Sequence, residues 1–96
     1  MSDLDPEKAL ALSEFFKSLS DPTRVRILEA LSREERKVGE LALELDVSQS
    51  ALSHQLRILR GQRMVTFRRE GKNAFYRLTD PSIIAVMRAG LDFASA

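Results

Sequence analysis

The first part of the chain repeats apolar residues at helical spacing in two segments. In residues 5–19 they fall at positions i, i+3, i+4 and i+7, namely Leu12, Phe15, Phe16 and Leu19. In residues 21–31 the apolar face consists of Val25, Ile27, Leu28 and Leu31. Each segment begins with an Asp-Pro pair, in which aspartate can cap the helix and proline fits its first turn. We therefore predict helices at 5–19 and 21–31, followed by a charged, solvated loop at 32–37.

The pattern of residues 39–60 predicts two helices separated by a tight turn. Apolar residues gather on one face of 39–45, and in 48–60 they recur inward as Ala51, Leu52, Leu56 and Leu59. Asp46 and Val47 form the turn between the helices. Ser48 is a suitable N-cap for the second helix, because its hydroxyl can accept a hydrogen bond from a backbone N–H of the first turn. This arrangement is typical of a helix-turn-helix whose second helix reads DNA.

The outward face of the 48–60 helix is polar and has no carboxylate. Together with Ser48 at its start, this face carries Gln49, Ser50, Ser53, His54 and Arg57. Their amide, hydroxyl, imidazole and guanidinium groups can bond to base edges and phosphates without repelling DNA. An ordinary amphipathic surface helix would show a similar polar face, so the interpretation also depends on the segment that follows.

Residues 64–78 alternate in the manner of a β-hairpin. Two strands, at 64–69 and 73–78, flank Gly71, which can adopt the positive φ of a tight turn. Within the strands, one parity is shared by Val65, Phe67 and Phe75, and the other by Arg68, Tyr76 and Leu78. The cations at or near the tip are Arg68, Arg69 and Lys72. A basic hairpin directly after such a helix indicates a wing that contacts the DNA backbone; a tip that serves only solubility is the alternative.

The last apolar segment predicts a helix at about 80–92, capped by Thr79 or Asp80 and with Pro81 at its first position. Its apolar stripe consists of Ile83, Ile84, Met87 and Leu91. So apolar a helix in so small a chain suggests a second copy as its partner. The stripe of the 5–19 helix suggests the same, through Leu12, Phe15 and Phe16; burial in the monomer core is the alternative for that helix.

The distribution of charge supports contact with nucleic acid. The chain has 96 residues, a length that fits one domain at 1–96. Its net charge is only +1, so the distribution of the charge is more informative than its sum. Residues 1–46 carry seven Lys or Arg and eleven Asp or Glu, whereas residues 47–79 carry seven and one. The positive charge therefore lies where phosphate would be bound. Cysteine, a membrane-length apolar run and a signal-peptide pattern do not occur, so we expect no disulfide, no membrane contact and a cytoplasmic location.

Taken together, these segments resemble the ArsR/SmtB family of bacterial and archaeal repressors. The resemblance depends on SLSDPTRVRILEAL at 18–31, KVGELALELDVSQSALSHQLRILR at 37–60 and RMVTFRREGKNAFYRL at 63–78. It implies a mainly α winged helix-turn-helix, in the order four helices, two strands and one helix, that forms a homodimer through its first and last helices. It also implies binding to double-stranded DNA at an inverted-repeat operator, which blocks transcription until an inducer binds and affects RNA polymerase only indirectly.

The same resemblance implies roles for individual residues. In family members with this motif, the positions matching Gln49, Ser50, Ser53 and His54 face the major groove. The wing positions matching Arg68, Arg69 and Lys72 approach the DNA backbone. Both assignments agree with the interpretation drawn from the residue types alone.

The metal ligands of the family are not found in this sequence. One family site needs cysteines where this chain has Lys37 and Gly39. The other needs an aspartate and several histidines or glutamates at the positions of Asp80, Ser82, Phe93 and Ala96. Only Asp80 matches, and it is explained as a helix cap, while the lone histidine, His54, lies on the DNA face. We therefore expect no metal site, no cofactor and no thiol sensor.

The sequence favours the first of three classes of function over the other two. The first is a dimeric repressor that is constitutive, regulated by its own abundance, or responsive to an organic ligand or partner protein at the dimer interface. The second is a winged-helix module that binds another protein, which the positive charge of residues 47–79 argues against. The third is an enzyme, but the sequence has no nucleophile–base pair and no glycine-rich phosphate loop, so we expect no catalytic residue.

Overall fold

The computed structural model describes residues 3–96, which form five α-helices and three β-strands. The helices are α1 (Pro6–Ser18), α2 (Pro22–Arg33), α3 (Val38–Leu45), α4 (Gln49–Gly61) and α5 (Ser82–Ser95). The strands are β1 (Arg36–Lys37), β2 (Val65–Glu70) and β3 (Asn73–Leu78). The predicted order of four helices, a hairpin and a last helix is confirmed, and β1 is an addition to it.

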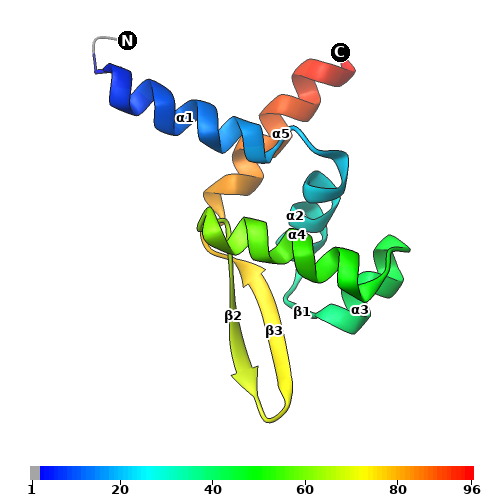
Figure 1. Ribbon diagram of the computed structural model, residues 1–96. Coiled ribbons are helices and arrows are strands. Elements are labelled where there is room, and N and C mark those ends of the chain that lie inside the picture. Colours follow the sequence, from blue (N-terminus) through cyan, green and yellow to red (C-terminus); the bar gives the residue numbers. More distant parts are fainter. Residues whose placement is uncertain (1–2) are drawn as a thin grey trace.

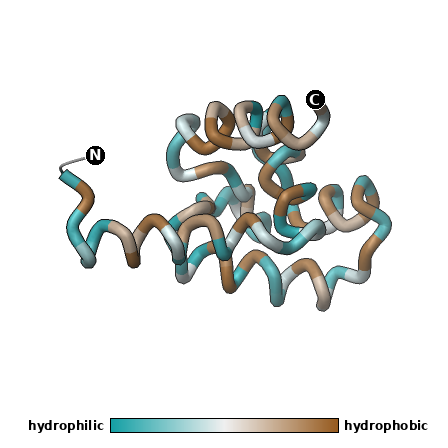
Figure 2. The backbone as a smooth tube through the Cα atoms, turned by 90° about the horizontal axis from the view of Figure 1, so that it is seen from above, coloured by the Kyte–Doolittle hydropathy of each residue, from teal (hydrophilic) through white to brown (hydrophobic). Residues whose placement is uncertain are grey.

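The elements give the molecule two distinct ends. Helices α2 and α4 lie at its centre with α3 beside them at the edge, and the β2–β3 hairpin projects from one side (Figure 1). Helix α1 and the end of α5 lie on the opposite side, and α1 extends well beyond the other helices (Figure 1, Figure 2). The hairpin end and the helical end therefore present separate surfaces.

The Asp-Pro pairs begin their helices as the sequence predicts. Asp5 Oδ1 accepts a hydrogen bond from the backbone N–H of Lys8 at 2.8 Å. Asp21 Oδ2 accepts from the N–H of Arg24 at 3.0 Å. Each bond satisfies a donor that the helix itself leaves without a partner, which fixes where α1 and α2 begin.

The hydrophobic core lies where α2, α3 and α4 meet the base of the hairpin. Its fully buried large apolar side chains are Ile27, Leu28, Leu41, Leu52, Leu56 and Leu59. Ile83 of α5 is also buried in this core, with 6% of its surface exposed. This corrects the expectation that Ile83 is part of a dimer interface: its side chain is already covered within one protomer.

Helix α1 contributes little to the core. Leu12 and Phe16 are 42% and 51% exposed, and the buried residue of this helix is Ser18. The Ser18 hydroxyl donates to Oε1 of Gln62, just beyond α4, and lies 3.3 Å from the Glu14 carbonyl. The alternative in which α1 is buried in the monomer core is therefore wrong.

Strand β1 replaces part of the predicted loop at 32–37. Arg36 and Lys37 pair antiparallel with Tyr76 and Phe75 of β3, in the strand order β1-β3-β2. Arg36 is buried, although the loop was expected to be solvated. Two adjacent charged residues show no alternation, so this strand follows only from its pairing with β3.

The hairpin register corrects one expectation about its faces. Phe67 lies opposite Tyr76, and Arg68 lies opposite Phe75. Because directly opposed residues share a face, Phe75 lies on the side of Arg68 and not on the side of Phe67. The turn is as predicted, with Gly71 at φ +62° in the left-handed region that glycine tolerates.

Candidate nucleic-acid interface

A short turn fixes the position of α4 relative to α3. Asp46 adopts a left-handed conformation with φ 56°, and the N–H of Val47 donates to the Ala42 carbonyl at 3.1 Å. Ser48 Oγ then accepts from the N–H of Ala51 at 3.1 Å, which begins α4 as predicted. These contacts end one helix and start the next within three residues, so the two helices are held at a defined angle.

One face of α4 anchors it to the core. Leu52, Leu56 and Leu59 are almost completely buried, with exposed fractions of 0%, 1% and 0%. Ala51 was expected to face inward, but it is exposed. The correction has a simple geometric reason: Leu52, Leu56 and Leu59 define the buried stripe, and Ala51 lies about 100° around the helix from Leu52.

The structure places the predicted polar residues together on the exposed side of α4. The exposed residues are Gln49, Ser50, Ser53, His54 and Arg57. The last four are spaced i, i+3, i+4 and i+7, so they form one row along the helix. Within residues 3–96 no acidic side chain forms an ion pair with this row. The row is therefore open to a ligand that offers both hydrogen-bond donors and acceptors, as a DNA groove does.

The neighbouring arginines of the wing have different environments. Arg68 Nη2 donates to Glu35 Oε1 at 2.5 Å, and its Nη1 donates to Glu70 Oε2 at 2.7 Å. Its guanidinium also lies 4.7 Å from the centre of the Phe75 ring. The hydrogen bond from Arg68 lowers the pKa of Glu35 below its ordinary value, and the same pairing raises the pKa of Arg68. Most donors of Arg68 are thus engaged within the protein.

Arg69 and Lys72 remain exposed at the wing, and among the described residues neither forms an ion pair. The guanidinium of Arg69 lies 5.4 Å from the centre of the Phe67 ring. Arg60, in the last turn of α4, lies 4.5 Å from the centre of the same ring. The Phe67 ring is therefore in cation–π contact with two arginines, one from α4 and one from the wing.

Sequence reasoning did not select Arg60 or Glu35 as functional residues. Arg60 follows Arg57 by three positions, so helical spacing alone could have indicated a second cation near the outward face. No comparable signal exists for Glu35, which is half-buried in a charged segment and meets Arg68 only through the fold. The structure thus adds Arg60 to the candidate site and shows that Glu35 is hydrogen-bonded to Arg68.

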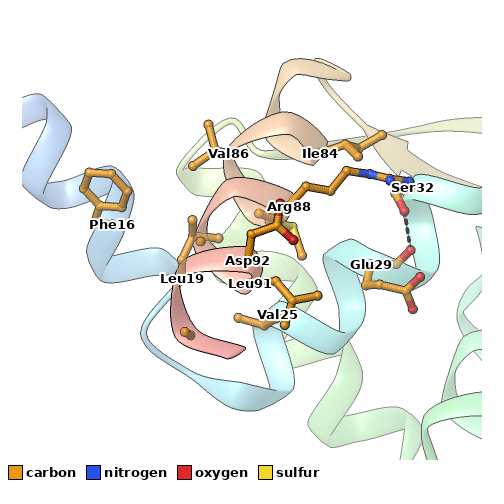
Figure 3. A pocket seen from close by; sticks show the side chains of 13 residues that line it. Phe16, Leu19, Val25, Glu29, Ser32, Ile84, Val86, Arg88, Leu91 and Asp92 are labelled. Carbon is orange, nitrogen blue, oxygen red and sulfur yellow. Dashed lines mark hydrogen bonds between the residues drawn. The ribbon is translucent and has the colours of Figure 1, made fainter. Parts of the chain in front are cut away.

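An apolar groove lies at the other end of the molecule. It is formed between α1, α2 and α5, has a volume of about 790 Å³, and is lined among others by Phe16, Leu19, Val25, Met87 and Leu91 (Figure 3). Of the residues predicted for a dimer interface, Leu12, Phe16 and Leu91 are exposed and Phe15, Ile84 and Met87 are half-buried. Leu4, Leu10 and Phe93 are further exposed apolar side chains of this end.

Within residues 3–96, no three histidine, cysteine, aspartate or glutamate side chains lie close enough together to hold a metal ion. In the same range, none of the helices combines the length and the apolar character that crossing a membrane would require.

Comparison with known proteins gives consistent results. The profile of the arsR family of bacterial regulatory proteins matches residues 21–66. A transcriptional repressor SmtB homolog from Synechocystis is 46% identical over 86 residues; these cover 90% of this chain, which spans only 65% of that protein's length. The crystal structure of NolR from Sinorhizobium fredii is 35% identical, with a TM-score of 0.84, and the match covers 100% of this chain and 99% of that one.

A third relative is described as a homodimer. It is the homodimeric winged helix-turn-helix DNA-binding domain of a possible ArsR-family transcriptional regulator from Mycobacterium bovis, solved by NMR. It is 26% identical, with a TM-score of 0.82, and the match covers 95% of this chain and 86% of that domain.

Proposed function

The chain belongs to the ArsR family of bacterial regulatory proteins and is a DNA-binding transcriptional regulator with a winged helix-turn-helix fold; we propose that it represses transcription by binding an inverted-repeat operator as a homodimer. The observation that supports this most directly is the exposed face of α4. That face has no carboxylate and leads through Arg60 and Phe67 to a basic wing.

We assign base contacts to four residues on the exposed face of α4. Gln49, Ser50, Ser53 and His54 carry uncharged polar groups that can donate to and accept from base edges in the major groove. Ser48 and Arg57 flank these residues. Ser48 lies at the N-terminus of α4, where the helix dipole and unpaired N–H groups favour a phosphate, and Arg57 supplies a positive charge.

We assign backbone contacts chiefly to Arg69 and Lys72. Both are exposed, and neither is paired with a carboxylate within the described part of the chain. The sequence predicts a backbone contact for Arg68 as well, but the bonds of Arg68 to Glu35 and Glu70 make it a weaker candidate for phosphate. The expected phosphate contacts would supply a large, salt-dependent part of the affinity.

We assign the dimer interface to α1 and α5. Leu12 and Phe16 of α1 and Leu91 of α5 are exposed apolar residues. Helix α1 and the end of α5 lie on the side of the molecule opposite the wing (Figure 1). A two-fold dimer formed there would present two α4 helices to two half-sites, which fits an inverted repeat. Such a dimer would act in the cytoplasm and would affect RNA polymerase indirectly, by occupying the operator.

The test is a comparison of two DNA molecules by fluorescence anisotropy. One carries the promoter DNA upstream of the protein's own gene, and the other has the same length and a scrambled sequence. Replacing Ser53 and His54 by alanine should weaken binding to promoter DNA by about ten- to a hundred-fold, because base contacts provide discrimination. Binding to scrambled DNA should change little, since its affinity comes mainly from phosphates.

A matched control uses a serine remote from α4. Ser20→Ala, in the exposed turn between α1 and α2, should leave binding to both DNAs unchanged. Equal losses on promoter and scrambled DNA for the Ser53 and His54 variant would contradict the assignment of base contacts to these residues.

A further inference from the structure

We propose that Glu35 is a positioning residue for the wing: it holds Arg68 in an intramolecular ion pair that fixes the hairpin and leaves Arg69 as the wing arginine that contacts phosphate. This inference rests on the proposed function, because it divides the wing cations into one that binds DNA and one that braces the wing.

Strand geometry separates the two arginines. Successive side chains of a strand point to opposite faces, so Arg68 and Arg69 cannot share a face of the hairpin. Arg69 lies on the side of Phe67, whose ring also contacts Arg60 of α4. Arg68 lies on the other side, opposite Phe75. Only the Arg69 side is therefore continuous with the helix that we assign to the major groove.

The ion pair crosses the whole sheet. Arg68 belongs to β2 and Glu35 directly precedes β1, and these two strands are the edges of a sheet in which β3 is central. To reach Glu35, the Arg68 side chain passes over the Phe75 ring of β3, at 4.7 Å from its centre. Arg68 Nε and Nη2 both bond to the Glu35 carboxylate, at 3.1 and 2.5 Å. Two bonds from one planar guanidinium fix direction as well as distance.

The segment that holds the wing is itself attached to the helix-turn-helix. Arg36, next to Glu35, is buried and forms ion pairs with Glu34, at 3.2 Å, and with Glu44 of α3. Glu44 also pairs with Arg33 at the end of α2, at 2.6 Å. Through Glu35 and its neighbour Arg36, the wing is therefore connected to α2 and α3.

We expect the Arg68–Glu35 ion pair to affect the position of the wing more than the stability of the whole fold. Arg68 and Glu35 have 43% and 32% of their side-chain surfaces exposed, and exposed ion pairs add little to the free energy of unfolding. A wing that is ordered before binding loses less conformational freedom when it meets DNA, so the effect should be measurable in affinity.

The experiment measures DNA affinity over a salt series for Arg68→Ala, Arg69→Ala, Glu35→Ala and the Glu35→Ala/Arg68→Ala double variant. For Arg69→Ala the slope of log affinity against log salt should become shallower by about 0.9, the value for one lost phosphate contact. Arg68→Ala and Glu35→Ala should keep the wild-type slope and each lose about two- to five-fold in affinity. The double variant should lose no more than either single variant, because both remove the same brace.

Asp3→Ala provides the matched control, since it removes an exposed carboxylate that precedes α1 and should leave affinity and slope unchanged. The inference is overturned if Arg68→Ala makes the slope as shallow as Arg69→Ala does, or if Glu35→Ala strengthens binding and steepens the slope. Failure of the proposed function looks different: the wild-type protein itself would then bind DNA without a salt dependence, or not at all.

Discussion

Replacing Phe16 by alanine should weaken the homodimer by about a thousand-fold. Phe16 is 51% exposed on α1 and borders the groove between α1, α2 and α5 (Figure 3). A fully covered phenylalanine buries about 150–250 Å², so about 100 Å² of this side chain remains for a second protomer to cover. At about 25 cal/mol per Å², and allowing for the surface that alanine keeps, the loss is about 2 kcal/mol in each protomer.

Symmetry doubles this effect. In a two-fold dimer the same residue is buried twice, so the free energy of association should fall by about 4 kcal/mol, which corresponds to the thousand-fold change in the dissociation constant. Within its own protomer Phe16 makes an edge contact with Phe15, at 5.5 Å between ring centres, and is not part of the buried core. The variant should therefore remain folded.

The assay is sedimentation equilibrium over a concentration series, with circular dichroism to confirm that each variant is folded. Leu43→Ala is the matched control, because Leu43 is 86% exposed but lies on α3, away from α1 and α5. Its dissociation constant should equal that of the wild type. An unchanged dimer in Phe16→Ala, or an equal loss in Leu43→Ala, would refute the assignment of the interface to the helical end.

Two further predictions concern stability at a fixed protein concentration. Leu56→Ala removes a core side chain that is 1% exposed, so the free energy of unfolding should fall by about 3–5 kcal/mol. Urea denaturation should show a lower midpoint at an unchanged slope. A loss below about 1 kcal/mol would contradict the packing of α4. Hydrogen bonds from Arg36 and Arg33 lower the pKa of Glu44 in the folded protein from its ordinary value of 4.5. The ionised Glu44 therefore stabilises the fold above that pH. This contribution is lost as the pH falls through the pKa that Glu44 has in the folded protein. Melting temperatures measured from neutral to acid pH should therefore fall less steeply for Glu44→Gln than for the wild type, and parallel curves would contradict the role of this ion-pair network.

The helices and the hairpin could be predicted because local signals determine them. Apolar spacing, Asp-Pro caps and a glycine between alternating segments each act within a few residues, and the structure forms the expected bonds at Asp5, Asp21 and Ser48. Strand β1 could not be predicted in this way. Arg36 and Lys37 carry no periodic pattern, and they are extended because β3, almost forty residues later, offers them hydrogen-bond partners.

The candidate site shows the same division. Helical spacing was sufficient to gather Ser50, Ser53, His54 and Arg57 on one face, because the period of a helix is fixed. In the wing, strand alternation places Arg68 and Arg69 on opposite faces, but it could not show which of the two is paired within the protein. Their difference depends on Glu35, which is 33 residues distant from Arg68 and meets it only after β1, β3 and β2 have assembled.

A hydrogen bond connects the end of α1 to the end of α4, the helix that we assign to DNA. A dimeric regulator fits two half-sites only when its two α4 helices have the separation and tilt that successive major grooves require. In this chain α1 would set that separation through the dimer, and the buried Ser18 at its end donates to Gln62, the residue that terminates α4. Since the backbone N–H of Gln62 also bonds to the Ile58 carbonyl of α4, at 3.1 Å, the end of α4 is tied directly to the end of α1. The packing of α1 between protomers and the placement of α4 on DNA are therefore expected to change together.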